Sequence, residues 1–103
     1  MVAPICKLTI VCPRKVAATL ADALDAMDPP PPGYTMIEAE GRGASASLPS
    51  TAERVRGAIH ATMFLLILPR DEVDRITETV RRDCPRPQIA YWVEPVEDYG
   101  RLI

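Results

Sequence analysis

An internal repeat is the feature that most constrains the fold of this chain. The segment Val11-Cys12-Pro13-Arg14 ends one apolar stretch, and Ile67-Leu68-Pro69-Arg70 repeats its pattern in the second half. In both places the proline precedes a helical pattern, where its missing N–H is no loss. The sequence therefore predicts two similar halves, each with the order strand, helix, strand.

Hydrophobic periodicity places the elements of each half. Strands are predicted over 5–11, 35–40, 58–68 and 89–96, with helices after Pro13 and Pro69. The helical stripes are apolar residues that recur every three or four positions: Val16, Leu20, Leu24 and Met27 in the first helix, and Val73, Ile76, Val80 and Cys84 in the second. With right-handed crossovers, this order predicts an α+β ferredoxin-like split βαβ fold (βαββαβ), a four-stranded antiparallel sheet with two helices on one face.

Local signals refine this assignment. The prolines at 29–32 end the first helix because they cannot continue it, and Gly33 begins the next strand. In the second helix, Asp71–Arg75 and Glu78–Arg82 are predicted to form acid-before-base pairs one turn apart.

Length and charge exclude several classes of protein. A chain of 103 residues is expected to form one domain, 1–103. Its formal net charge of −2 argues against nucleic acid as a partner and against an anionic membrane surface. The longest apolar run, residues 63–68, is far too short to insert into a membrane, and no signal peptide begins the chain. We therefore expect a cytoplasmic protein.

The strand at 58–68 has almost no polar side, and residues 63–68 are apolar at every position. A strand that is apolar on both sides is normally buried on both sides, but two helices can cover only one face of the sheet. Another copy of the same sheet would cover the second face most simply. The sequence therefore predicts a homo-oligomer, in the simplest case a homotrimer.

The connection over 42–57 is much longer than a hairpin turn requires, which is typical of a functional or mobile arm. Arg42 stands between Gly41 and Gly43 at one end, and Arg56 precedes Gly57 at the other. Guanidinium groups bind phosphate or carboxylate, and glycine permits close approach of backbone amides. With Arg101 in the tail, these residues are candidates for a site that binds a small anionic effector, although each arginine alone could be a solvated surface residue.

Catalytic and nucleic-acid functions find little support. The single histidine, His60, has no visible nucleophile as a partner, so we expect no enzyme. The residues after Arg56-Gly57 lack the aromatic side chains that RNA-recognition sheets use for stacking. Cys6, Cys12 and Cys84 are interpreted as small buried hydrophobic residues. A metal site made by His60 and a cysteine of another subunit remains an alternative.

Several segments, in order along nearly the whole chain, resemble P-II signalling proteins: 38–43 (EAEGRG), 55–58 (VRGA), 67–73 (ILPRDEV), 93–97 (VEPVE) and Arg101. The resemblance implies a ferredoxin-like trimer with an extended arm, the T-loop, over about 42–57. In that family the T-loop contacts transporters or enzymes. It also implies adenine nucleotides (ATP, ADP or AMP) in the clefts between subunits.

The departures from the P-II pattern indicate a divergent branch. Ala44 and Val55 stand where P-II proteins have glutamine and tyrosine, and His60 stands where some have a modified tyrosine. The glycine-rich phosphate loop is replaced by residues 83–88 (DCPRPQ), in which prolines remove amide donors and Arg86 is the expected substitute. Short chains of this kind are associated, by resemblance, with heavy-metal efflux. The rival hypothesis is a metal-binding trimer akin to the copper-tolerance protein CutA.

Overall fold

The computed structural model describes residues 4–42 and 58–103 of the chain. Its elements follow the predicted order and include a short 3₁₀ turn before each helix. The first half contains β1 (Ile5–Pro13), a 3₁₀ turn (Arg14–Val16), α1 (Ala17–Asp25) and β2 (Thr35–Arg42). The second half contains β3 (Ala58–Pro69), a 3₁₀ turn (Arg70–Glu72), α3 (Val73–Asp83) and β4 (Ala90–Pro95).

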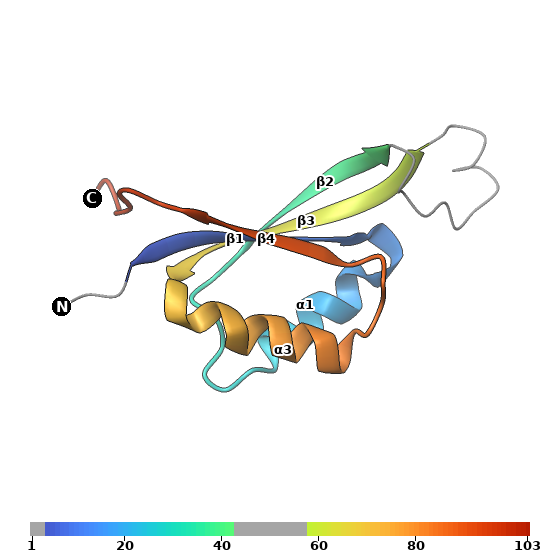
Figure 1. The fold of residues 1–103 in the computed structure, drawn as a ribbon, viewed down its shortest axis with the longest axis horizontal. Helices are drawn as coiled ribbons and strands as arrows, with labels where there is room; N and C mark the ends of the chain where they lie inside the picture. Colours follow the sequence, from blue (N-terminus) through green and yellow to red (C-terminus); the bar gives the residue numbers. More distant parts are fainter. Residues whose placement is uncertain (1–3, 43–57) are drawn as a thin grey trace.

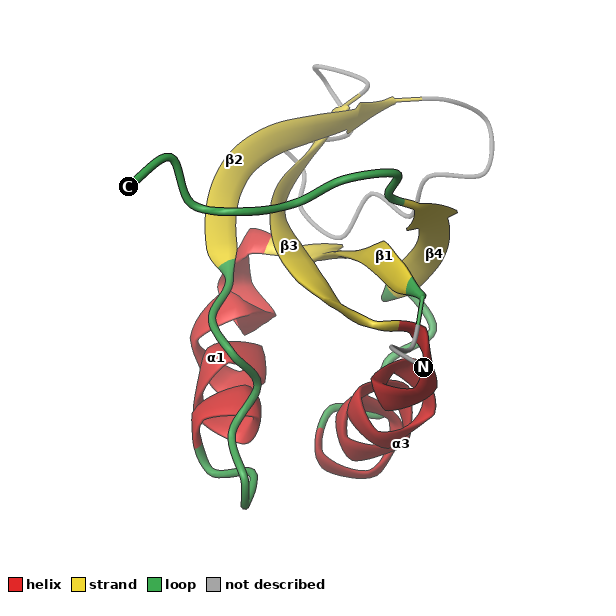
Figure 2. Cartoon of the chain, turned by 90° about the vertical axis from the view of Figure 1, so that its left-hand side faces the viewer, coloured by secondary structure: helices red, strands yellow, loops and turns green. Residues whose placement is uncertain are grey.

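The four strands form one antiparallel sheet in the order β2-β3-β1-β4. Both helices lie on the same side of this sheet, α1 below β2 and α3 below β4 (Figures 1 and 2). The predicted ferredoxin-like fold is therefore confirmed. Within residues 4–42 and 58–103, no helix is long and apolar enough to cross a bilayer.

The repeated strand-to-helix corners have almost identical backbones. Pro13 has φ −57° and ψ 140°, and Pro69 has φ −59° and ψ 141°; each precedes a 3₁₀ turn. The fixed φ of proline suits this entry into a helix. In the pairing of β1 with β3, Pro13 lies opposite Ala61 and Pro69 opposite Ile5, so the two corners occupy opposite ends of the strand pair.

The core lies between the sheet and the helices, where the predicted stripes meet. Its fully buried side chains come from both halves of the chain, and the largest are Leu8, Ile10, Leu20, Leu24, Phe64, Leu66 and Ile76. Burying each such side chain contributes roughly 1.5–3 kcal/mol. The three cysteines are buried with free thiols in the same layer, as predicted.

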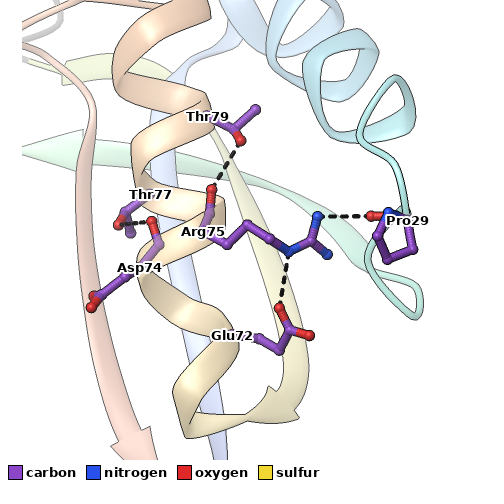
Figure 3. Close-up of polar contacts among 6 residues, drawn as sticks. All are labelled: Pro29, Glu72, Asp74, Arg75, Thr77 and Thr79. Atoms are coloured by element: carbon purple, nitrogen blue, oxygen red, sulfur yellow. Dashed lines mark hydrogen bonds and ion pairs between the residues drawn. The ribbon is translucent and has the colours of Figure 1, made fainter.

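The two predicted ion pairs of α3 are wrong. Arg75 Nε contacts Glu72 Oε2 at 3.0 Å, three positions earlier, instead of Asp71 (Figure 3); both acidic residues lie in the tighter 3₁₀ turn, where the four-residue spacing of a regular α-helix does not hold. Arg82 contacts Asp83 with two nitrogens, at 3.0 and 3.3 Å, instead of Glu78. This fork-like contact gives Arg82 two charge-assisted hydrogen bonds.

The paired strands β2 and β3 continue beyond the end of β1. Pairing between β1 and β3 ends at Ala61, whereas β2 and β3 remain paired as far as Arg42 and Ala58. This two-stranded extension rises away from the helices (Figure 1). The predicted T-loop, with Gly43, Arg56 and Gly57, lies outside the described residues apart from Arg42 at its base.

Candidate functional site

The sheet face opposite the helices, here called the outer face, is mostly apolar. Its side chains alternate with those of the core and include Val11, Ile37, Ala39, Met63, Leu65, Ile67 and Trp92. Ile37 and Trp92 are each 44% exposed. The predicted apolar second face is therefore present. Contiguous apolar surface of this kind marks an interaction site.

The polar groups at the β4 edge of the outer face are paired with one another. Glu94 accepts a hydrogen bond from Trp92 Nε1 at 3.0 Å and lies 3.3 Å from Lys7 Nζ. The hydrogen bond from Trp92, with help from the Lys7 ammonium, lowers the pKa of Glu94. The indole N–H is thus satisfied, and the ring can lie against an apolar partner.

Gly41 and Arg42 lie at the far end of β2. A Cβ added to Gly41 would lie 2.7 Å from Ile59 Cγ2, so a larger residue there would force the Ile59 side chain to shift. Arg42 Nη2 lies 3.5 Å from Glu40 Oε2, and Glu40 is opposite His60. An anion that binds Arg42 must therefore compete with a neighbouring carboxylate.

A single chain does not bring the predicted arginines together. Arg42 is on the β2 edge of the sheet, whereas Arg86 precedes β4 on the opposite edge. Arg101 lies in the tail that follows β4. This tail starts where Val96 N donates to Ile5 O, at the end of the sheet farthest from Arg42 (Figure 1). Gly43, Arg56 and Gly57 are beyond the described residues. A common site would therefore need more than one copy.

Three of the four backbone N–H groups in the α3–β4 loop, residues 84–89, donate to carbonyls of α3 or of the loop itself. The amide of Cys84 donates to Val80 O at 2.7 Å, that of Arg86 to Cys84 O at 2.8 Å, and that of Ile89 to Arg86 O at 3.2 Å. Pro85 and Pro87 have no N–H. The sequence indicated that the prolines remove two amide donors, but it did not indicate that three of the remaining amides are already bonded. The guanidinium group of Arg86 is thus the main group in this loop that could bind an anion.

The structure reveals two cavities beside Arg86 that sequence reasoning missed. The larger, here called the α3–β4 cavity, has a volume of about 340 Å³. Arg81 and Arg86 line it, and its apolar walls are formed by Ile10, Val80, Cys84, Ile89 and Tyr91. The smaller, of about 240 Å³, includes Lys15 and Arg86. No sequence pattern marks either cavity, because residues from distant elements form them.

The three cysteines lie in surroundings that favour the protonated thiol. Burial raises the pKa of all three thiols, and burial together with the nearby Cys84 raises the pKa of Cys12 to about 11. The thiolate is the form that binds metal. In the part of the chain that the structure describes, no three His, Cys, Asp or Glu side chains gather as a metal site. A site shared between copies through His60 stays a prediction.

Comparison with solved structures supports the assignment of the fold. A DUF3240 family protein from Shewanella baltica OS155 is 14% identical, with 98% of this chain and 99% of that chain covered and a TM-score of 0.77. CPII, a nitrogen regulatory PII-like protein from Thiomonas intermedia K12 bound to ADP, AMP and bicarbonate, is 21% identical, with 97% of each chain covered and a TM-score of 0.68.

Arabidopsis thaliana PII bound to citrate is 14% identical, with 97% of this chain and 84% of that chain covered and a TM-score of 0.73. No curated protein matches the sequence. The family described as "Protein of unknown function (DUF3240)" matches residues 2–103. The chain therefore belongs to the DUF3240 family, and it has the PII-like fold that the sequence resemblance implied.

Proposed function

We propose that this protein is a cytoplasmic, non-enzymatic regulator. Residues 1–103 would form one domain, and three copies would assemble into a homotrimer. The observation that carries this proposal is the apolar outer face. The helices of the same chain cover only the opposite face. Association of copies through the outer face would remove its apolar side chains from water, the main favourable contribution to such assembly.

The positions of the arginines support clefts between copies as the effector site. Arg42 and Arg86 lie on opposite edges of the sheet, and Arg101 extends from the end of β4. When sheets associate, edges of different copies become neighbours, so arginines that are separate within one chain can face the same ligand. Gly41, Gly43, Arg56 and Gly57 complete the proposed site at the base of the loop.

The proposed effector is a small anion, with the adenine nucleotides AMP, ADP and ATP as the first candidates. The likeness to CPII, whose structure holds ADP and AMP, supports this choice. Because the α3–β4 loop uses most of its amides internally, phosphate groups would depend on guanidinium contacts.

Effector binding would shift residues 42–57 between conformers and so control a transporter or an enzyme. The shift cannot exceed the difference in effector affinity between those conformers. The association of short P-II-like chains with heavy-metal efflux makes an efflux transporter the first partner to test, by co-purification with the intact loop.

Sedimentation at micromolar concentration tests the assembly. We expect a mass of three 11.3 kDa chains for the wild type. Leu65→Glu, which places a carboxylate on the outer face, should sediment as one chain, whereas Ala18→Glu, on the exposed side of α1, should leave the trimer intact. A wild-type mass of one chain would remove the basis of the proposal.

Calorimetry with AMP, ADP and ATP tests the effector. We expect at least one nucleotide to bind, with affinity about tenfold weaker in Arg42→Ala, because a charge-assisted contact is lost. Arg82→Ala is the matched control, since Arg82 pairs with Asp83 outside the proposed site. No heat with any nucleotide would reject the nucleotide part while leaving the assembly result unaffected.

A further inference from the structure

We propose that the α3–β4 cavity binds a small carboxylate that carries an apolar body, such as a ring or a short acyl chain. The cavity opens between the C-terminal half of α3, the α3–β4 loop and the start of β4. It lies within a single chain. The proposal therefore does not need the assembly proposed above, although the cavity shares Arg86 with the proposed nucleotide site.

The interior of the cavity suits an apolar body. Its walls include the side chains of Ile10, Val80 and Cys84, which are 1%, 6% and 4% exposed, and of Ile89, which is partly buried. Tyr91 completes the lining and is 51% exposed. The volume of about 340 Å³ is at the lower end of the range for small-molecule sites, which favours a compact ligand.

The charged lining residues carry one sign. Arg81 and Arg86 line the cavity, and no acidic residue does. Other arginines of the same region differ: Arg75 and Arg82 each have a carboxylate oxygen at 3.0 Å. Among the described residues, no ion pair involves Arg81 or Arg86. Two guanidinium groups beside an apolar cavity therefore present positive charge that an anionic ligand can neutralise.

The polar groups around the α3–β4 cavity favour a carboxylate over a phosphate. Phosphate sites commonly use several backbone amides, whereas the amides of Cys84, Arg86 and Ile89 donate to carbonyls of α3 and the loop. Thr77 Oγ1 is also engaged, donating to Asp74 O at 3.2 Å (Figure 3). A carboxylate needs only the two oxygens that a guanidinium fork can satisfy.

The test is a nuclear magnetic resonance titration of the ¹⁵N-labelled full chain with phenylacetate. We expect saturable shifts of the amide signals of Cys84, Ile89 and Tyr91. Acetate, which has the charge without the body, and 2-phenylethanol, which has the body without the charge, should each bind at least about tenfold more weakly, because each lacks one of the two matched features.

Arg81→Gln and Arg86→Gln should each weaken phenylacetate binding about tenfold. Arg82→Gln is the matched control: it makes the same substitution at the next position of α3, where the arginine pairs with Asp83, and should leave binding unchanged. The proposal is overturned if no shift saturates at these amides, if 2-phenylethanol binds as tightly, or if Arg82→Gln is as harmful as Arg81→Gln. Phenyl phosphate binding as tightly as phenylacetate would overturn the carboxylate assignment.

Discussion

The two connections that lead from a helix to the last strand of each half occupy equivalent places in the repeat. The first, residues 26–34, follows α1, and the second, residues 84–89, follows α3. Both contain prolines, which stop the preceding helix. Their side-chain contacts nevertheless differ: the first connection is fixed to the rest of the domain, and the second bonds mainly to itself.

The first connection is held from three sides. Arg75 of α3 donates from Nη1 to Pro29 O at 2.9 Å while its Nε contacts Glu72, as Figure 3 shows. Tyr34 donates from its hydroxyl to Asp25 Oδ1 at 2.8 Å, and its ring lies 5.5 Å from that of Phe64. The contacts with Arg75 and Phe64 join the two halves of the chain.

Among the described residues, the second connection packs Cys84 and Ile89 against the core, but no side-chain hydrogen bond joins it to another element. Its amides bond to the end of α3 and to its own carbonyls, and Arg86 lies beside two cavities. The same position in the repeat thus joins neighbouring elements in the first half, whereas in the second half it borders the cavity that we propose as a ligand site. The three predictions that follow test this contrast.

The largest expected effect is on stability in Tyr34→Ala. The substitution removes the ring packed against Phe64 and the hydrogen bond to Asp25, so the free energy of unfolding should fall by about 2–3 kcal/mol. Tyr91→Ala, beside the second connection and 51% exposed, should lower it by less than about 1 kcal/mol. Urea unfolding measures both, and equal losses would break the contrast.

A smaller effect is expected for Arg75→Ala. Loss of the contacts to Pro29 O and Glu72 should lower the free energy of unfolding by about 1 kcal/mol, because the side chain is partly exposed. Arg86→Ala should change it by less than about 0.5 kcal/mol. Thermal unfolding measures both variants. If Arg86→Ala is the more destabilising of the two, the second connection contributes more to stability than the first, and the proposed difference between them is wrong.

The third effect appears only at high pH. Burial, with the hydrogen bond to Asp25, raises the pKa of Tyr34 to about 12. Because this value exceeds that of an unfolded tyrosine, near 10, the stabilisation is complete below about pH 10 and is lost as pH rises through 12. Tyrosinate absorbance should therefore show a component near pH 12 that Tyr34→Phe lacks; an unchanged titration curve would contradict this assignment.

Much of the fold could be predicted because local patterns and burial agree. The corner at Pro13 and Pro69 predicted the repeat, and residues such as Leu20 and Ile76 predicted the buried faces, since helical period and core position coincide. The ion partners of Arg75 and Arg82 could not be predicted, because they depend on where the 3₁₀ turn gives way to the helix and on side-chain geometry.

The candidate sites were less accessible to sequence reasoning. Gly41 suggested close approach of an anion, yet its contact with Ile59 depends on strand register. The α3–β4 cavity is formed by β1, α3 and β4 together, so no spacing along the chain indicates it. Arg86 was identified, but only as a substitute in a phosphate loop.

Arg86 lines both the α3–β4 cavity and the smaller cavity that includes Lys15. One guanidinium group carries a single positive charge, so an anion held in one of these cavities would neutralise it and weaken its attraction for an anion in the other. Thermodynamic reciprocity then requires each to weaken the other's binding by the same factor. A single side chain would thus couple the two cavities.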